Sequence, residues 1–176
     1  TLGHYGIAGH YAEEIADLTQ TPQAWSIAGT TFTMGVLQED GKEDVRKYCA
    51  DKAESAFQNA ISLDPDELDY KLNLATAYAE YPPEDNPMKG ILMQLEMSRE
   101  YPEYMPVQLS LARFGLKTGQ FDKAAGRLEK VLEREPNNLR AHCLIADAYA
   151  GLEKIEAAEK HKNICTASQM PINKSN

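Results

Sequence analysis

The chain has 176 residues, of which 43% are hydrophobic and 26% charged, the balance of an ordinary globular protein. Its formal net charge of −9 argues against nucleic acid as a partner, because binding to phosphates depends on clustered Lys and Arg. No stretch approaches the roughly 18 to 20 apolar residues of a membrane span, so the sequence predicts a soluble chain without one.

Residues 1–21 open with the letters TLGHYGIA, a near-copy of KTGQFDKA at residues 117–124. Such an echo indicates a repeated unit. The letters that follow, YGIAGHYAEEIADL, are therefore predicted to form the second helix of a helical pair, and the chain is expected to begin halfway through a unit. The positions that correspond are Gly3 with Gly119, Tyr5 with Phe121, and Ala8 with Ala124.

Residues 22–67 are predicted to form a complete pair of helices. Apolar and small residues at i, i+3, i+4 and i+7 define one face of the first helix. The second helix, within AESAFQNAISLDPDE, is expected to end before Pro65, since proline forces its predecessor out of helical geometry. The residues of the first helical face are Trp25, Ala28, Gly29 and Phe32.

The letters QEDGKEDVRKYC lie between these two helices. They make the connection about twelve residues longer than in the 34-residue unit at residues 105–138. We expect an inserted loop at about residues 38–49, with helix from about Glu43, because Gly41 and its charged neighbours favour a loop start. An extra turn that lengthens the preceding helix is the alternative. Because loops on a rigid scaffold often carry function, the insertion is expected to contact a partner.

Residues 68–104 are predicted to form the next pair, from LDYKLNLATAYAE and MKGILMQLEMSREYP. The position for a small residue in the second helix is contested by Met88, Gly90 and Ile91. Apolar residues cover more than one face of this helix, and a Met-rich surface is an adaptable interface. Burial in the core is the alternative. The self-association candidates are Met88, Met93 and Met97.

Residues 105–138 form one unit of 34 residues, MPVQLSLARFGLKTGQFDKAAGRLEKVLEREPNN, and residues 139–166 open the next directly. Residues 167–176 are expected to be a polar tail. The unit at 105–138 resembles the tetratricopeptide repeat (TPR) family, and the last unit matches through Ile145, Ala146, Tyr149 and Ala158. The matching residues of the 34-residue unit are Leu111, Ala112, Gly119, Ala124, Leu128, Val131 and Pro136.

The resemblance implies an all-α, right-handed α-α superhelix, a TPR solenoid of about nine helices. Its units would be a half repeat at 1–21 and full repeats at 22–67, 68–104, 105–138 and 139–166. The segment NAISLDPDE after a long connection is also similar to bacterial envelope TPR modules of the cytochrome c biogenesis type. The bacterial periplasm or envelope is therefore one expected location, and the cytoplasm is the other.

In the TPR family the first helices line a concave groove that binds an extended peptide or a partner helix. The resemblance thus implies a scaffold or adaptor with a protein or peptide partner. We expect a basic spot at Arg113, Lys117 and Arg140 to hold an acidic group of the ligand, with solvated groove charges as the alternative. The groove candidates are Gln23, Ser26, Thr30, Asp69, Leu72, Thr76, Leu109, Arg113, Lys117, Arg140, Cys143 and Asp147.

The distribution of charge favours a second hypothesis, a self-associating part of a larger TPR assembly. Residues 1–104 carry 19 acidic and 7 basic residues, whereas residues 105–176 carry 8 acidic and 11 basic residues. This polarity would favour head-to-tail contact or steer a charged partner. The alternative is a set of solvated helix faces.

The sequence offers few groups for chemistry. Cys49, Cys143 and Cys165 show no paired spacing, and buried free thiols are favoured over a disulfide between Cys143 and Cys165. The four histidines show no metal-ligand spacing, and His142 is expected to pack in the core. With no phosphate loop or catalytic motif, we predict no enzyme, no cofactor and no metal. A thiol-dependent enzyme built on Cys143 is the remote alternative.

Overall fold

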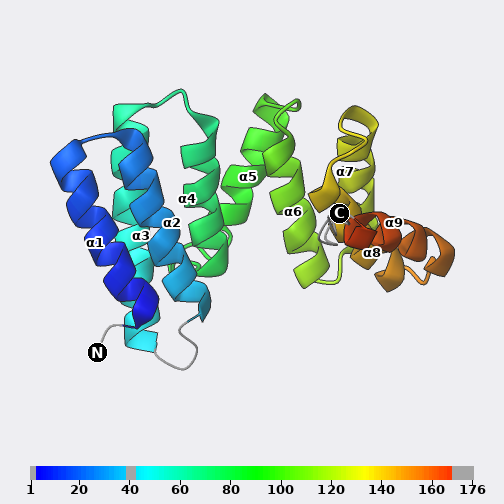
Figure 1. The fold of residues 1–176 in the computed structure, drawn as a ribbon, viewed down its shortest axis with the longest axis horizontal. Helices are drawn as coiled ribbons and strands as arrows, with labels where there is room; N and C mark the ends of the chain where they lie inside the picture. Colours follow the sequence, from blue (N-terminus) through cyan, green and yellow to red (C-terminus); the bar gives the residue numbers. More distant parts are fainter. Residues whose placement is uncertain (1–2, 39–42, 168–176) are drawn as a thin grey trace, which may run out of the picture. The chain divides into compact units, whose positions relative to one another are not determined.

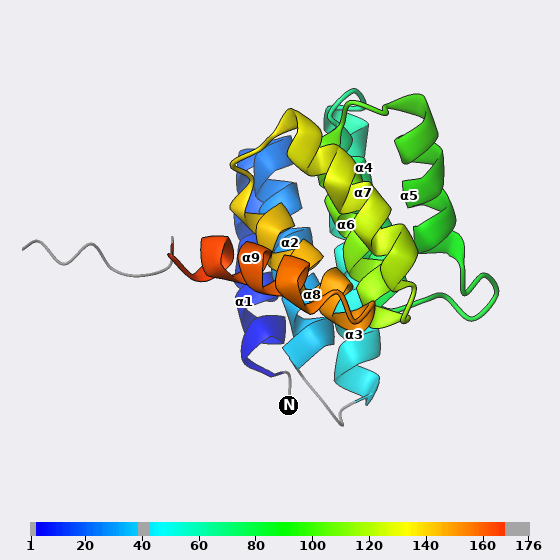
Figure 2. The same ribbon diagram turned by 90° about the vertical axis from the view of Figure 1, so that its right-hand side faces the viewer.

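The computed structural model describes residues 3–38 and 43–167. Over these ranges the regular structure consists of nine α-helices and no strand, and within each unit successive helices pack against one another (Figures 1 and 2). The predicted all-α helical repeat fold is confirmed. The helices are α1 (His4–Thr19), α2 (Pro22–Gln38), α3 (Glu43–Leu63), α4 (Leu68–Glu80), α5 (Lys89–Glu100), α6 (Met105–Lys117), α7 (Phe121–Arg134), α8 (Leu139–Gly151) and α9 (Ile155–Ala167).

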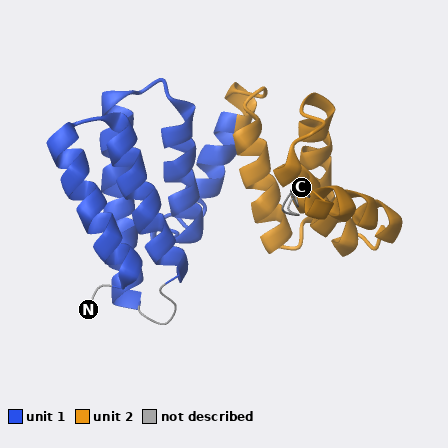
Figure 3. Cartoon of the chain, in the orientation of Figure 1, with its two compact units in different colours: residues 1–97 blue, residues 98–176 orange. Residues whose placement is uncertain are grey.

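The chain divides into two compact units, unit 1 at residues 1–97 and unit 2 at residues 98–176 (Figure 3). The division falls inside α5 and not between two predicted repeats. The repeat boundaries stay predictions, and the helices α2, α4, α6 and α8 begin at residues 22, 68, 105 and 139.

The helices of unit 1 pack by fitting aromatic rings over glycines. A Cβ atom added to Gly9 of α1 would lie 2.5 Å from the ring of Phe32 of α2. A Cβ added to Gly29 of α2 would likewise lie 2.7 Å from the ring of Phe57 of α3. Both rings are buried, so α1, α2 and α3 share a close-packed core. The short distance between these helices depends on the glycines, which carry no side chain.

The described part of the inserted segment is helical, with a helix that starts at Glu43 as expected, so a loop as far as residue 49 is not found. α2 continues to Gln38 and α3 begins at Glu43, while residues 39–42 lie outside the described part of the chain. The added residues therefore lengthen the following helix, which has 21 residues. The added turns pack against α2, because Cys49 is fully buried and a Cβ on Gly35 would lie 2.7 Å from its sulfur.

The residues around α5 form less of a methionine surface than the sequence indicates. Met97 is buried and Met93 packs against the core of unit 1, whereas Met88, just before the helix, is half exposed. Gly90 takes the small-residue position, since a Cβ there would lie 2.4 Å from the backbone oxygen of Ala75 in α4. Met97 is therefore too buried to form a contact with another copy, while self-association through Met88 and the partly buried Met93 stays a prediction.

Candidate functional site

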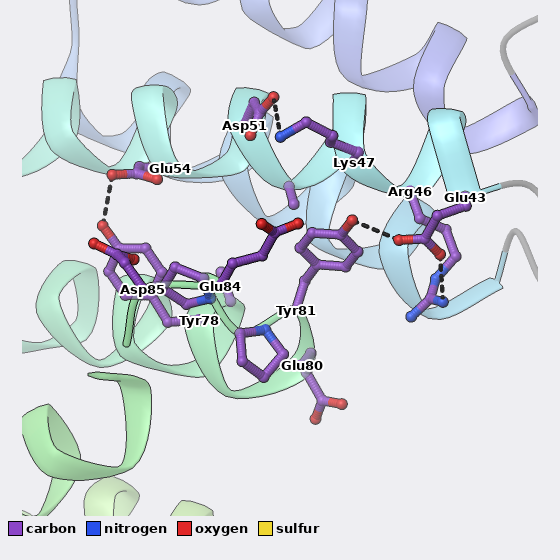
Figure 4. A pocket seen from close by; sticks show the side chains of 14 residues that line it. Glu43, Arg46, Lys47, Asp51, Glu54, Tyr78, Glu80, Tyr81, Glu84 and Asp85 are labelled. Carbon is purple, nitrogen blue, oxygen red and sulfur yellow. Dashed lines mark hydrogen bonds and ion pairs between the residues drawn. The ribbon is translucent and has the colours of Figure 1, made fainter. Parts of the chain in front are cut away.

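A pocket that lies within unit 1 encloses about 770 Å³ (Figure 4). It lies between the first half of α3, the end of α4 and the segment that follows α4. Its α3 residues recur at i, i+3, i+4, i+7, i+8 and i+11, so they share one helical face. The lining residues are Glu43, Arg46, Lys47, Ala50, Asp51, Glu54, Ala77, Tyr78, Glu80, Tyr81, Pro82, Pro83, Glu84 and Asp85.

Acidic side chains dominate this acidic pocket, with six carboxylates and two cations in its lining. The two cations are already paired on α3: Arg46 lies 3.2 Å from Glu43, and Lys47 lies 3.6 Å from Asp51. Because four further carboxylates remain, the lining has a net negative charge, and a cation that enters it is attracted.

Two tyrosines bridge the helices that form the acidic pocket. The Tyr78 hydroxyl donates a hydrogen bond to Oε1 of Glu54 over 2.7 Å, and the Tyr81 hydroxyl donates to Oε1 of Glu43 over 2.5 Å (Figure 4). The hydrogen bond to Glu43, together with burial, raises the pKa of Tyr81 to about 12. Burial is the main cause that raises the pKa of Tyr78. Both hydroxyls therefore stay protonated at neutral pH and act as donors.

The faces of these tyrosines already lie against cations of the chain. The guanidinium carbon of Arg46 lies 5.6 Å from the ring centroid of Tyr81, and Nζ of Lys89 lies 3.8 Å from that of Tyr78. Such cation–π contacts are favourable within about 6 Å. The contacts of Arg46 and Lys89 thus show that the tyrosine rings of the acidic pocket can bind cationic side chains.

The groove candidates divide between the two units. In unit 1, α2 contacts α4, and of their candidates Gln23, Thr30 and Asp69 are exposed while Ser26 and Thr76 are half-buried. In unit 2, α6 contacts α8, and the exposed candidates are Arg113, Lys117, Arg140 and Asp147. Within each unit, polar candidates from two neighbouring helices are therefore available to a ligand.

Two groove candidates are wrong because their side chains are buried. Leu72 and Leu109 are each only 7% exposed. Leu109 shares a helical face with Met105 and Ala112, four residues before and three after it, and all three belong to the core of unit 2. The side chains of Leu72 and Leu109 pack in the interior, where a ligand in a surface groove would not contact them.

The cysteines of unit 2 correct the prediction of free thiols. Cys143 of α8 and Cys165 of α9 form a disulfide, whereas Cys49 is a buried thiol in unit 1. Because the nucleophile of a thiol-dependent enzyme is a thiolate, Cys143 in this disulfide has no such role. Its disulfide also lies on the face where the groove contact of Cys143 was expected.

His142 is buried and makes two hydrogen bonds, as a packing histidine should. Its Nε2 lies 2.9 Å from the carbonyl oxygen of Pro136, which only accepts, so Nε2 donates. Its Nδ1 lies 2.8 Å from Nδ1 of His161, which must then be the donor in the neutral pair. Burial, followed by the charges of His142 and Lys160, lowers the pKa of His161.

The described part of the chain, residues 3–38 and 43–167, contains neither a candidate metal cluster nor a candidate membrane-spanning helix. Over these ranges no three His, Cys, Asp or Glu side chains are grouped so that they could hold a metal ion. None of the described helices combines the length and the apolar character that crossing a membrane requires.

Comparison with known proteins gives the family. Residues 115–161 match the family model described as Tetratricopeptide repeat. The chain therefore contains a tetratricopeptide repeat. This TPR protein is also similar in fold to a solved structure, "Crystal structure of MamA protein", with a TM-score of 0.55 and 16% sequence identity, over 92% of this chain and 81% of that one. At this identity the likeness shows the fold alone.

No protein of curated function matches the sequence of this TPR protein significantly. Tetratricopeptide repeats generally mediate protein–protein interaction, and their fold is typically a non-catalytic scaffold. The TPR protein thus belongs to a class that binds other proteins.

Sequence reasoning missed most of the acidic pocket. No sequence motif points to Tyr78, Glu54 or Asp51 as residues of a site. The sequence does contain two acidic segments that flank helices of successive units. One is the insertion QEDGKED, and the other is YPPED, which includes a tyrosine. The two acidic segments come together only because α3 packs on α4. A local sequence pattern does not predict that tertiary contact.

Proposed function

We propose that this TPR protein is a scaffold or adaptor that binds a basic segment of a partner protein in the acidic pocket. The single observation that carries the proposal is the lining of a volume of about 770 Å³, to which six carboxylates, two tyrosines and only two cations belong. An Arg or Lys side chain there would form charge-assisted hydrogen bonds with carboxylates such as Glu84 and Asp85, which are exposed. It would also lie near the rings of Tyr78 and Tyr81.

The insertion supports this proposal because it builds one wall of the acidic pocket. Glu43, Arg46 and Lys47 belong to the turns that the insertion adds to α3. Unit 1 as a whole carries 17 acidic and 6 basic residues, a net charge of −11. A field of this sign would speed the approach of a basic partner at low ionic strength.

The concave faces of the first helices stay part of the proposal as further contacts of the ligand. In unit 1 they would offer polar groups such as Gln23 and Asp69. In unit 2 the basic spot of Arg113, Lys117 and Arg140 would hold an acidic group by charge-assisted hydrogen bonds. The exposure of these side chains supports such a role.

The test is fluorescence anisotropy with two short labelled peptides, one of alternating Arg and Ser and one of alternating Glu and Ser. We expect the basic peptide to bind, and the double change Glu84→Lys with Asp85→Lys to weaken it about tenfold or more, since two charged contacts are lost. The matched control, Asp66→Lys with Glu96→Lys, makes the same change of net charge at exposed acids outside the pocket.

Three results would count against these assignments. An equal loss in the pocket variant and its control would mean that only net charge matters. No binding of the basic peptide would remove the acidic pocket as its site. If Arg113→Ala with Arg140→Ala left the affinity for the acidic peptide unchanged, the basic spot would be abandoned.

A second candidate function, self-association as part of a larger TPR assembly, is favoured by the outer face of α1. Ile7, Tyr11, Ile15 and Leu18 lie at i, i+4, i+8 and i+11, and all are exposed, Leu18 by 86%. Such a contiguous apolar stripe is typical of an interaction surface.

Light scattering across a range of concentrations tests this second candidate. We expect the mass of the unaltered chain to rise with concentration, and Ile15→Lys to abolish that rise by burying a charge in the contact. Leu92→Lys, at an exposed leucine of α5, is the matched control and should keep the rise. A monomer at every concentration would exclude self-association and leave the acidic pocket as the working surface.

A further inference from the structure

The last helix of unit 2 has little apolar burial of its own. Among the residues of α9, Ala158 alone is buried, whereas the adjacent α8 buries five. Ile155 and Ile164 of α9 remain exposed. Because most helical stability in proteins comes from packing of an apolar face, α9 needs other contacts to stay in place.

A disulfide and a hydrogen bond between two histidines are two specific contacts that connect α8 to α9. The disulfide joins Cys143 to Cys165 across a sequence separation of 22 residues, with their Cα atoms 5.1 Å apart. One turn before Cys165, His161 donates to His142 over 2.8 Å. The covalent bond is the stronger of the two, so reduction of these sulfurs removes the strongest single link between α8 and α9.

A second pocket, lined by residues of α8 and α9, gives access to this bond. It encloses about 420 Å³, and both Cys143 and Cys165 belong to its lining. Small side chains, Ala146 and Ala150, leave the space open, and the charged residues of the lining are Lys162, Asp147 and Glu159. A small thiolate that enters the α8–α9 pocket can reach a sulfur from inside it.

We propose that the Cys143–Cys165 disulfide is a thiol–disulfide exchange site, and that a small dithiol entering the α8–α9 pocket reduces it and releases α9. The thiolate of the dithiol attacks one sulfur, forms a mixed disulfide and expels the other cysteine as a thiolate, which takes a proton from water. The second thiol, deprotonated in turn, attacks the mixed disulfide. The dithiol leaves as a cyclic disulfide, oxidised by two electrons, and the chain holds two reduced cysteines.

Release of α9 would change the surface of unit 2. The face of α8 that carries Cys143 and Ala146 lines the pocket against α9, and it would become accessible once α9 leaves. This inference is independent of the acidic pocket, since all its residues belong to unit 2.

Hydrogen exchange with mass spectrometry on the full chain tests the release. With dithiothreitol as the dithiol, we expect amide exchange in residues 155–167 to rise at least tenfold, while α6 keeps its protection. The double variant Cys143→Ser with Cys165→Ser should show the fast exchange with and without dithiothreitol. Cys49→Ala, which removes the buried thiol of unit 1, should keep the full response. Identical protection of α9 in the oxidised and reduced chains would overturn the proposal.

The route through the α8–α9 pocket is tested separately by the rate of reduction. Ala150 is exposed and lines the pocket, so Ala150→Trp should fill it without disturbing the core and slow reduction by dithiothreitol about tenfold. Ala167→Trp, at an exposed residue outside the lining, should reduce at the rate of the unaltered chain. Equal rates for the two variants would overturn entry through the pocket.

Discussion

Gly90→Ala is expected to lower the free energy of unfolding of unit 1 by about 2 kcal/mol or more. The added Cβ would lie 2.4 Å from the backbone oxygen of Ala75 and 2.5 Å from the backbone nitrogen of Ala79. Backbone atoms cannot rotate away as a side-chain tip does, so α5 would have to shift from α4. This cost outweighs the gain of about 1 kcal/mol that alanine brings to a helix interior.

Urea denaturation followed by far-UV circular dichroism and by the fluorescence of Trp25 measures this loss. Trp25 is the chain's one tryptophan and is buried in unit 1, so its signal reports on that unit. Gly126→Ala is the matched control, because a Cβ there meets nothing within 4 Å. Gly126→Ala should raise the free energy of unfolding of unit 2 by up to about 1 kcal/mol, which circular dichroism would detect. A gain for Gly90→Ala would mean that α5 does not approach α4 so closely.

The helical repeat fold was predictable because its signal is local. Trp25, Ala28, Gly29 and Phe32 repeat with the period of a helix, and all four are buried in the structure. The small-residue position of α5 was not predictable in the same way. Met88, Gly90 and Ile91 lie within one turn, and the distance between two helices decides which one faces the neighbour.

The sites were harder to predict because they depend on contacts between distant segments. Tyr81 and Glu43 are 38 residues apart, and their hydrogen bond exists because α3 is extended at its start and α4 ends beside it. The disulfide depends likewise on the separation of two Cα atoms, which spacing in sequence does not give. Leu72 and Leu109 were misplaced for a related reason, since a repeat position predicts a face but not whether the chain itself covers it.

Leu128→Ala is expected to lower the free energy of unfolding of unit 2 by about 2 to 5 kcal/mol. Leu128 of α7 is fully buried in a core that includes Met105 of α6 and Ile145 of α8. Alanine would remove apolar contact with both helices and leave a cavity, because neighbouring helices relax only in part. Helix propensity changes little, so the loss reports on packing.

Leu132→Ala, one turn further along α7, is the matched control. Its side chain is only partly buried against the same core, so the loss should be clearly smaller. Circular dichroism gives the loss in each variant, and hydrogen exchange in α7 and α8 shows whether it arises in unit 2. Equal losses at Leu128 and Leu132 would mean that the core is not centred on Leu128. A larger loss at Leu128 would mean that the core around this side chain links α7 to both α6 and α8.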